Sequence, residues 1–427
     1  MSATTSPAAA KQPTDYDVII AGGGLAGLSL AYALQQVLPW RIAVIEAKPL
    51  PTGAVPATPS SHYDERVLAL SAMTVRILKA LNLWSTLANK GYPIRHIHVS
   101  DEGNYGKVRL DAEQQSGATE FGQVLAARHL GEHLQHQAEQ AALDWFRPAH
   151  IESTSVLADH REVKLNTGDT LRCQLLVVAD GGESNTCDVL GIEAEEHDYQ
   201  HVAVIANITT DKPHNGLAVE RFTANGPLAL LPMTEQRRSL VWTLPPERAA
   251  EVVKLSEQAF SEQLQQAMGY RHGLITQVGS RQSYPLKRRL VTHAGLPRAV
   301  IIGNAAHALH PIAGQGFNLA LRDVMELAMQ LNKRGVQADI GTPSVIQHYQ
   351  QQRQGDQIKV ANATHALATL FSNDLPPLKW ARNLGLVAMS HVPPAQQWLV
   401  NQAMGVSALS EIVEGWSTGK SENAKGS

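Results

Sequence analysis

Three apolar runs, far apart in the chain, each end at a glycine or an acidic residue. Residues 18–21 lead into Gly22, residues 175–179 into Asp180, and residues 299–302 into Gly303. Uninterrupted runs of this length are typical of strands buried on both faces of a parallel sheet. Because ligands bind beyond the carboxyl ends of such strands, we expect the three breaks to meet at one bound molecule.

The rest of the hydrophobic pattern predicts helices around these strands and a second sheet. Helical patterns cover residues 28–38, 72–90 and 127–142, and a long helix follows Asn318. That last helix ends at Gly335, after Lys333 and Arg334, as a helix C-terminus should. Short strand-like runs separated by turn residues predict an antiparallel sheet; they are 202–206, 219–222, 228–231 and 239–242.

The first break carries a dinucleotide fingerprint. Gly22, Gly24 and Gly27 have G-x-G-x-x-G spacing between a predicted strand and a predicted helix. The first glycine permits a tight turn, the second lets the backbone approach a pyrophosphate, and the third lets helix and strand pack closely. The helix N-terminus, with Leu25 and Ala26 in its first turn, then directs free N–H groups at the phosphates.

An acidic residue at the end of the next predicted strand completes this motif. Glu46 lies 19 residues beyond Gly27, where a carboxylate binds ribose hydroxyls. A free 2′-OH fits FAD or NAD better than NADP. The breaks at Asp180-Gly181 and Gly303-Asn304 favour FAD, because a flavin needs polar anchors for its ribityl chain and ring, which a nicotinamide enzyme does not.

Composition narrows the classes of function. The 427 residues are long for one core, so we expect two domains. With 36 basic and 39 acidic residues, the charge gives no reason to expect nucleic acid as a partner. Cys173 and Cys187 have neither metal-ligand nor disulfide spacing, the 18 histidines form no metal-binding motif, and a reducing cytoplasm is the expected compartment.

The two ends of the chain are expected to be disordered. Residues 1–14 are small and polar and do not read as a signal peptide, and residues 417–427 are polar. The chain has no apolar run of about 18 residues, so we expect no membrane-spanning segment.

The three motifs, in this order and spacing, resemble those of the FAD-dependent aromatic hydroxylases related to para-hydroxybenzoate hydroxylase. Within that family the chain most resembles the ubiquinone-biosynthesis hydroxylases, in particular those that act on 2-polyprenyl-6-methoxyphenol. The resemblance covers about residues 16–405. The closer match is carried by Phe222 and by residues 64–71, 226–232, 239–242 and 303–323.

The resemblance implies an α/β fold in which a Rossmann-like FAD-binding domain, of the glutathione-reductase-like type, is interleaved with an antiparallel substrate domain. The FAD-binding domain is expected at residues 15–75, 100–190 and 290–345, and the substrate domain at 76–99 and 191–289. Residues 346–416 are expected to form a C-terminal helical region.

The resemblance also implies the chemistry. Reduced flavin reacts with O2 to give a C4a-hydroperoxide, which delivers one oxygen atom to the ring of a prenylated phenol, and NAD(P)H is the expected electron donor. There is one glycine fingerprint and no separate nicotinamide domain, as in the family. The expected flavin loop contains Pro311, Gly314, Gly316, Phe317 and Asn318, and opens a helix whose N-terminus stabilises the reduced ring.

By the same resemblance, Arg66 lies near the isoalloxazine, Arg128 near the phosphates, and Asp180-Gly181 near the pyrophosphate and the nicotinamide donor. Two positions depart from the family pattern. Asn304 stands where an aspartate accepts hydrogen bonds from the ribityl hydroxyls, and an asparagine can both accept and donate. Cys187 stands where many relatives have an arginine, which leaves the donor contact open.

No catalytic base can be named from the sequence. His307 and His310 flank the flavin loop, but structural histidines explain them equally well. The apolar C-terminal region, with Trp380 and Trp398, fits a peripheral membrane contact or a place in a ubiquinone-biosynthesis complex, and core packing explains it better.

Three other functions stay open. They are a flavin dehydrogenase or oxidase, a halogenase, and a non-catalytic scaffold subunit of a biosynthetic complex. The halogenase is disfavoured because this sequence has no W-x-W-x-I-P motif.

Overall fold

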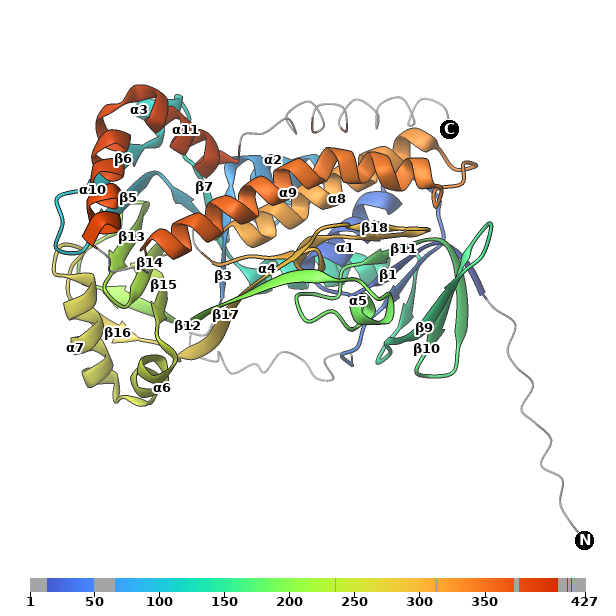
Figure 1. Ribbon diagram of the computed structural model, residues 1–427, viewed down its shortest axis with the longest axis horizontal. Helices are drawn as coiled ribbons and strands as arrows, with labels where there is room; N and C mark the ends of the chain where they lie inside the picture. The colour runs from blue at the N-terminus through green and yellow to red at the C-terminus, as the bar shows by residue number, and fades with distance from the viewer. Residues whose placement is uncertain are drawn as a thin grey trace, which may run out of the picture.

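The structure is a computed structural model that describes residues 14–49, 66–234, 236–311, 314–371, 376–405, 413 and 416. Two large sheets lie at opposite ends of an elongated molecule, and two long helices run along its length between them (Figure 1). These helices are α8 (Gln315–Arg334) and α9 (Pro343–Phe371).

The first sheet has parallel strands at its centre, in the order β19-β11-β1-β2-β8. Its core strands β1 (Thr14–Ala21), β2 (Ile42–Ile45), β11 (Thr170–Val178) and β19 (Ala299–Ile301) are largely buried apolar residues, as the hydrophobic runs predict. The remaining strands are β8 (Leu143–Phe146), β9 (Ile151–Val156), β10 (Arg161–Leu165) and β18 (Gly295–Leu296).

Helices cover the parallel strands and bury their apolar side chains. Helix α1 (Leu25–Gln35) packs against α8 and α4 (Ala127–Gln140) and contributes seven buried residues. The short helix α5 (Asn185–Val189) follows β11. Helix α8 is buried along most of its length because α1, α2 (Ala72–Ala80) and α9 all pack on it.

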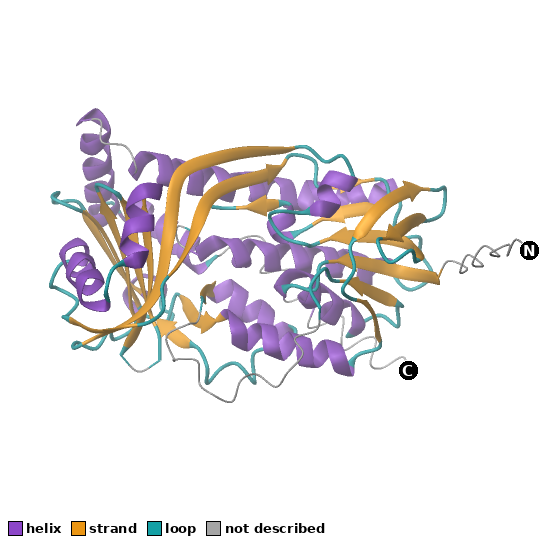
Figure 2. Ribbon diagram, turned by 90° about the horizontal axis from the view of Figure 1, so that it is seen from below, coloured by secondary structure: helices purple, strands orange, loops and turns teal. Residues whose placement is uncertain are grey.

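The second sheet is mostly antiparallel, in the order β20-β17-β12-β15-β14-β13-β5-β6, with β16 (Ile275–Val278) paired to β12. Two of its strands, β12 (Ala194–Thr210) and β17 (Gln282–Val291), are long enough to reach back to the parallel sheet (Figure 2). The others are β5 (His96–Asp101), β6 (Lys107–Asp111), β13 (Leu217–Thr223), β14 (Gly226–Pro232), β15 (Arg237–Leu244) and β20 (His307–Ala308).

The two faces of this second sheet differ. Alternate residues such as Val219, Leu230 and Leu240 are buried against α6 (Pro246–Lys254) and α7 (Glu257–Met268), which cover the outer face. The inner face packs in part on a third, three-stranded sheet and on α10 (Pro376–His391) and α11 (Pro393–Met404). That small sheet contains β3 (Val67–Ser71), β7 (Gly122–Ala126) and β4 (Tyr92–Ile94), and α3 (Ala112–Ser116) lies between β6 and β7 in the chain.

The α/β fold class predicted from the sequence is confirmed. One helix is shorter than its pattern predicts: α2 ends at Ala80, and residues 81–90 form turns. Asn82 has φ 58°, a left-handed conformation that cannot continue a helix. The expected leader lies outside the described residues except for Thr14, where β1 begins, and so does the expected tail at 417–427.

Candidate functional site

The three sequence breaks lie side by side at one edge of the parallel sheet. In the strand register, Ala21 lies beside Val178, and Val178 beside Ile301. The Ala179 N–H donates to Ala21 O at 2.7 Å, and the Ile302 N–H to Val178 O at 2.9 Å. The turns that follow, at Gly22, Asp180 and Gly303, therefore form one continuous rim, as the sequence predicts.

Each fingerprint glycine meets a different steric demand. Gly22 has φ +112°, and a Cβ there would lie 2.5 Å from Ala179 O. A Cβ on Gly27 would lie 2.0 Å from Gly22 O, so α1 can pack on the turn only if this residue is glycine. Gly24 is exposed, and a Cβ there would meet none of the described residues within 4 Å. Of these three glycines, Gly24 is thus the one that faces outward, toward the position of a ligand.

The carboxylate of Glu46 is fixed at the end of β2. Its Oε2 accepts from the Gly23 N–H at 2.8 Å, and its Oε1 accepts from the Lys48 N–H at 2.9 Å. Each carboxylate oxygen has a second lone-pair direction that remains able to accept a hydrogen bond. The side chain is therefore held rigidly beside the α1 N-terminus and keeps acceptor capacity for a ribose.

Asp180 shapes the second turn. Its carboxylate accepts from the Ser184 hydroxyl and from the Thr186 N–H at 3.1 Å, which ties β11 to the start of α5. Gly181 has φ +98°, and a Cβ there would meet nothing within 4 Å in the described part of the chain. The Asp180 side chain therefore supports the rim, while the backbone at Gly181 stays open.

The third turn lies against α1 and α8. Gly303 has φ +61°, and a Cβ there would lie 3.1 Å from Ala26 Cβ on α1 and 3.4 Å from Ala320 Cβ on α8. The Asn304 side chain is exposed, with its Oδ1 3.8 Å from the Cβ position of Gly316. Asn304 and the start of α8 thus face the same space.

The glycine loop before α8 is fastened to β3. Gly314 has φ +60°, and a Cβ there would lie 2.7 Å from Ala69 Cβ. The Asn318 amide donates to Ala69 O and Gly314 O and accepts from the Ser71 N–H, at 2.9 to 3.0 Å. No described side chain caps the α8 N-terminus. Pro311 is exposed at the start of the loop, and residues 312–313 lie outside the described part.

The chain matches the FAD binding domain family over residues 15–362. It is 32% identical to ubiquinone hydroxylase UbiL of Rhodospirillum rubrum over 408 residues, which cover 95% of this chain and 93% of that relative. The chain belongs to the FAD binding domain family, and within it to the ubiquinone-biosynthesis hydroxylases. It is an FAD-dependent aromatic monooxygenase.

Other relatives of this monooxygenase agree. It is 30% identical to the 3-demethoxyubiquinol 3-hydroxylase of Escherichia coli over 408 residues, which cover 92% of this chain and 99% of that protein. Among solved structures, p-nitrophenol 4-monooxygenase PnpA of Pseudomonas putida gives a TM-score of 0.73 at 16% identity. The match covers 94% of this chain and 99% of that one, and shows that the two share a fold.

The geometry of the monooxygenase fits FAD at the rim. Gly24 is an open glycine at a helix N-terminus that no described side chain caps, as close approach of a pyrophosphate requires. We propose that Gly22, Gly24, Leu25, Ala26 and Gly27 hold the pyrophosphate. We likewise propose that Glu46 holds the adenosine ribose, that Asp180 and Gly181 lie near the pyrophosphate and the nicotinamide donor, and that Asn304 lines the ribityl chain. Pro311, Gly316 and Phe317 are proposed to border the ring.

Three predicted cofactor residues have side chains that are engaged with the protein. The Asn318 amide is fully used in fastening the loop to β3. Arg66 stacks over the Tyr284 ring, 4.3 Å from its centroid, just before β3. Arg128 pairs with Glu132 at 3.2 Å on α4. On that helix, the Cβ position of Gly131 lies 3.7 Å from Leu25 Cδ2, so Arg128 lies close to the α1 N-terminus. A phosphate contact for Arg128 remains a proposal.

The two histidine candidates differ in their surroundings. His307 is completely buried, and its Nε2 lies 2.6 Å from Asp323 Oδ2. His310 is buried beside the Tyr199 ring at 4.9 Å between centroids. Burial, with a smaller effect of His201, lowers the pKa of His310 to about 4, so its imidazole is neutral at pH 7. We propose a structural role for His307.

Cys187 is buried in α5, with its Sγ 4.0 Å from Ala305 O beneath the Gly303 turn. Burial raises the pKa of its thiol above the ordinary value. The side chain therefore packs as a small neutral group and offers no charge to a nicotinamide donor.

Sequence reasoning missed a buried charge network behind the rim. The Asp323 carboxylate accepts from the Gly303 N–H at 3.0 Å and lies beside His307. It also accepts from Arg353 Nε at 2.8 Å and Gln357 Nε2 at 2.9 Å, both on α9. One feature of the sequence could have revealed this network. Asp323 is an acidic residue on the apolar face of a predicted helix, because it lies between Leu321 and Val324.

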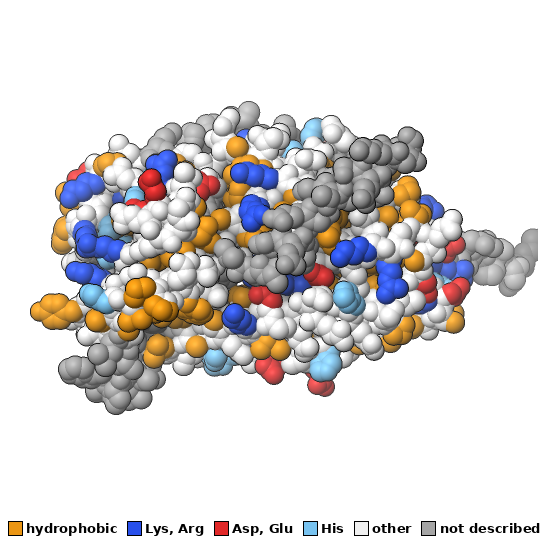
Figure 3. Space-filling view, turned by 90° about the horizontal axis from the view of Figure 1, so that it is seen from above, with side chains coloured by type: hydrophobic (Ala, Val, Ile, Leu, Met, Phe, Trp, Pro, Cys, Tyr) orange, Lys and Arg blue, Asp and Glu red, His pale blue; other side chains and the backbone are white. Residues whose placement is uncertain are grey.

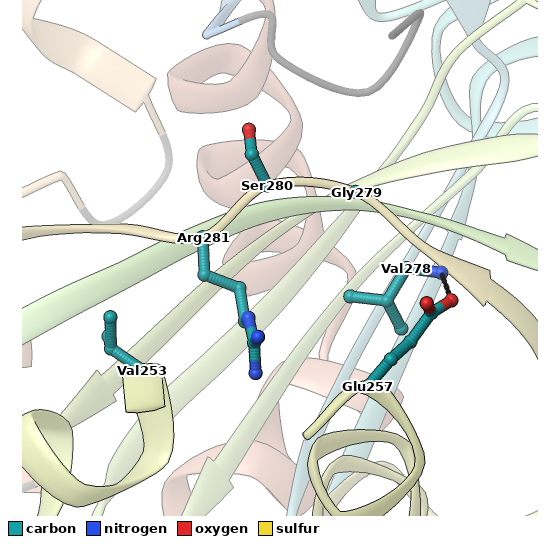
Figure 4. A pocket seen from close by; sticks show the side chains of 6 residues that line it. All are labelled: Val253, Glu257, Val278, Gly279, Ser280 and Arg281. Carbon is teal, nitrogen blue, oxygen red and sulfur yellow. Dashed lines mark hydrogen bonds between the residues drawn. The ribbon is translucent and has the colours of Figure 1, made fainter. Parts of the chain in front are cut away.

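Outside this rim, a pocket lies between α6, α7 and the loop before β17. It encloses about 340 Å³, and its charged side chains, Arg281 and Glu257, lie beside Val278 (Figure 4). Glu257 accepts from the Val278 N–H at 3.2 Å, and Arg281 donates to Leu255 O at 2.6 Å. These two hydrogen bonds hold the loop before β17 against the junction between α6 and α7.

The predicted membrane contact concerns the surface and the C-terminal helices. On the face shown in Figure 3, Lys and Arg side chains are spread out rather than gathered in one patch. Among the described residues, no helix has the length and apolar character needed to cross a membrane. In the C-terminal helices, Leu386 is buried and packs with Met389 and Leu399, whereas Trp398 is 46% exposed.

Proposed function

We propose that this monooxygenase hydroxylates the ring of a polyprenylated phenol in ubiquinone biosynthesis, with 2-polyprenyl-6-methoxyphenol as the substrate. The observation that carries the proposal is the identity of 30 to 32% to two ubiquinone hydroxylases over more than nine-tenths of the chain. This similarity includes the second sheet as well as the FAD rim. A match limited to the rim would support a cofactor but no substrate.

The described residues would bind and orient the reactants. Bound FAD supplies the oxygen-transfer chemistry. The α8 N-terminus directs N–H groups and a positive dipole end at the loop, where negative charge on a reduced ring would be stabilised. Asn318 holds this loop against β3, so the ring edge has a rigid border. The inner face of the second sheet would border the opposite side of the reacting ring and limit its contact with water.

A second candidate substrate is the phenol that the Escherichia coli relative acts on, 3-demethoxyubiquinol, because that protein is 30% identical over 92% of this chain. The two candidates differ in the ring position hydroxylated. Incubation of the FAD-loaded protein with a short-chain version of each phenol, NAD(P)H and O2 would separate them. NMR of the product ring gives the position. If neither phenol gave a hydroxylated product, the proposal would be contradicted.

We propose NAD(P)H as the electron donor and O2 as the co-substrate. Anaerobic bleaching of the flavin by NADH or NADPH, with and without the phenol, would identify the donor. Failure of both nicotinamides to bleach the flavin would point to a separate reductase. Peripheral membrane contact and a place in a biosynthetic complex remain predictions, for which the exposed Trp398 is the first residue to substitute.

A further inference from the structure

A row of partly accessible side chains crosses the inner face of the second sheet. In the strand register, Glu220 lies opposite Ala229, Ala229 opposite Val241, Val241 opposite Ile205, and Ile205 opposite Gln282. Residues directly opposite each other in a sheet point to the same face. All five keep part of their surface accessible, whereas their neighbours Val219, Leu230, Leu240 and Val204 are buried on the outer face.

This row faces the flavin loop through β3. Arg66 stacks on Tyr284, which lies two residues beyond Gln282 on the same face. Val67 packs in the same cluster as Phe222, which flanks Glu220 on β13. Ala69, two residues along β3, lies against Gly314 of the flavin loop. One short strand therefore borders both the row and the flavin loop, and the row lies where the substrate ring must approach the flavin.

Glu220 is the one residue of the row whose side chain ionises. Its side chain is half-buried, and the part that stays accessible leaves room beside it for a small group. Among the described residues its oxygens have no hydrogen-bond or ion-pair partner. A half-buried carboxylate without a protein partner can accept a hydrogen bond from a ligand that enters the space beside it.

We propose that Glu220 is the general base that removes the phenolic proton of the substrate; this rests on the proposed hydroxylation of a phenol. A phenolate is more electron-rich than a phenol and accepts an electrophilic oxygen atom more readily. The phenol O–H proton moves to a Glu220 oxygen, which leaves a phenolate and a neutral side chain. After hydroxylation the proton returns to the oxygen of the product.

The overall reaction balances with the groups already named. One atom of O2 enters a ring C–H bond, and the other leaves as water with two electrons from the nicotinamide donor. Glu220 accepts one proton from the substrate and gives it back to the product, so this proton appears on neither side of the overall equation.

The protonation behaviour of Glu220 fits this role. Burial raises the pKa of its carboxyl to about 7, which makes it a stronger base than an ordinary carboxylate and keeps about half of it ionised at neutral pH. The charged or titratable side chains that share its face or cover it are Asp101, Arg237, Tyr284, Arg66 and Tyr92. None of them contributes to the shift, whose cause is burial alone.

The test compares Glu220→Gln with the wild-type protein on a short-chain 2-prenyl-6-methoxyphenol. The wild-type hydroxylation rate should fall as pH drops below about 7, because the protonated carboxyl cannot accept a proton. The Gln variant should keep its FAD spectrum, lose about 10²- to 10⁴-fold in rate at pH 7 and lose this pH limb. Glu220→Asp should retain the limb at a reduced rate, because it keeps a carboxylate.

A ring-fluorinated analogue of the same phenol separates a catalytic role of Glu220 from a structural one. The measured quantity is the ratio of the wild-type rate to the rate of the Gln variant, which a purely structural role would leave unchanged. Its phenol is more acidic and needs the base less, so it should narrow the gap between the Gln variant and the wild type. Glu196→Gln is the matched control, because Glu196 lies in the same sheet with a side chain that is 65% exposed. It should behave as wild type.

The outcomes separate the two proposals. A wild-type protein that hydroxylates neither phenol contradicts the proposed function. A wild-type protein that hydroxylates them, together with a Gln variant within a few-fold of its rate at pH 7, overturns the role of Glu220. A rate deficit that fluorination leaves unchanged overturns that role as well.

Discussion

Two of the fingerprint glycines are needed for different physical reasons. Gly27 is glycine because α1 packs directly on the turn, with its Cβ position 2.0 Å from Gly22 O. Gly24 is glycine although its Cβ position is free of described atoms and its φ of −79° suits any residue. The open space at Gly24 therefore leaves room for a ligand, whereas backbone atoms of the turn occupy the space at Gly27.

Substituting these two glycines should separate ligand binding from folding. Gly24→Ala should leave the thermal midpoint of the apoprotein unchanged and weaken FAD by about tenfold or more, equal to about 1.4 kcal/mol. Gly27→Ala should lower the free energy of unfolding by about 1–3 kcal/mol, because the methyl group has no room. Denaturation of apoprotein and FAD titration measure the two effects. Normal FAD affinity in the Gly24→Ala variant would contradict the pyrophosphate assignment.

Asp323 is the residue on which the Gly303 turn depends. Burial alone would raise the pKa of this carboxyl, but His307 and Arg353 oppose it and hold the pKa below its ordinary value. Asp323→Asn should cost about 3–5 kcal/mol of unfolding free energy, because the buried Arg353 Nε and His307 lose the carboxylate that they share and Arg353 keeps only its pair with Asp356. FAD affinity should fall as well, since the Gly303 N–H loses its anchor.

The pH dependence of stability gives an independent check on Asp323. Because the folded pKa is depressed, the carboxylate stabilises the protein above the unfolded pKa of about 4, and that contribution is lost as pH falls through the folded pKa. The Asn variant should lack this acid-side loss in urea unfolding. Asp144→Asn, which breaks a surface pair with Arg41, is the control and should cost no more than about 1 kcal/mol. Equal losses in both variants would contradict this role of Asp323.

At the scale of elements, β3 joins the flavin loop to the second sheet, and the Asn318 amide fastens one to the other. Asn318→Ala would leave the Ser71 N–H and Ala69 O without partners, at a cost of about 1–3 kcal/mol. We expect faster hydrogen exchange at Ser71 and weaker FAD binding.

Asn362→Ala on α9 removes an exposed hydrogen bond that Arg288 on β17 donates, and it is the matched control. Hydrogen exchange by mass spectrometry should show no change around β3 in this variant. Protection of Ser71 that survives in Asn318→Ala would mean that β3 is held by its pairing with β7 alone.

Elements were predictable where the signal is local. The strand ends at Gly22, Asp180 and Gly303 follow from apolar runs, and the start of α8 from its glycines. The full length of β12 was not predictable, because residues 195–198 are exposed and charged or polar and carry no hydrophobic alternation. Their pairing with β17 makes them a strand, and that pairing is a contact between distant segments.

At the scale of the molecule, the FAD rim was predictable and the substrate side was not. Gly22, Gly24 and Gly27 act through spacing along one segment. Glu220 is conspicuous only after four strands have been aligned beside it, and its isolation depends on all of them. Arg353 likewise gains a role only when α9 lies along α8.

FAD should stabilise the whole molecule, because the rim joins three strand ends and the helices α1 and α8. Binding to the folded state alone adds about 2.7 kcal/mol when free FAD is a hundred times its Kd. The apoprotein should therefore unfold at a lower temperature than the holoprotein, and added FAD should restore the midpoint in proportion to the logarithm of its concentration. A midpoint that does not respond to FAD would contradict binding at a site built from these elements.

The most direct test of the central claim is a turnover under isotopically heavy O2 with a short-chain 2-prenyl-6-methoxyphenol and NAD(P)H. Mass spectrometry of the product should show a single heavy oxygen atom on the ring, with flavin released from the denatured protein and identified as FAD. An unlabelled hydroxyl, or a colourless protein that cannot be reconstituted with FAD, would contradict a flavin monooxygenase acting on a phenol.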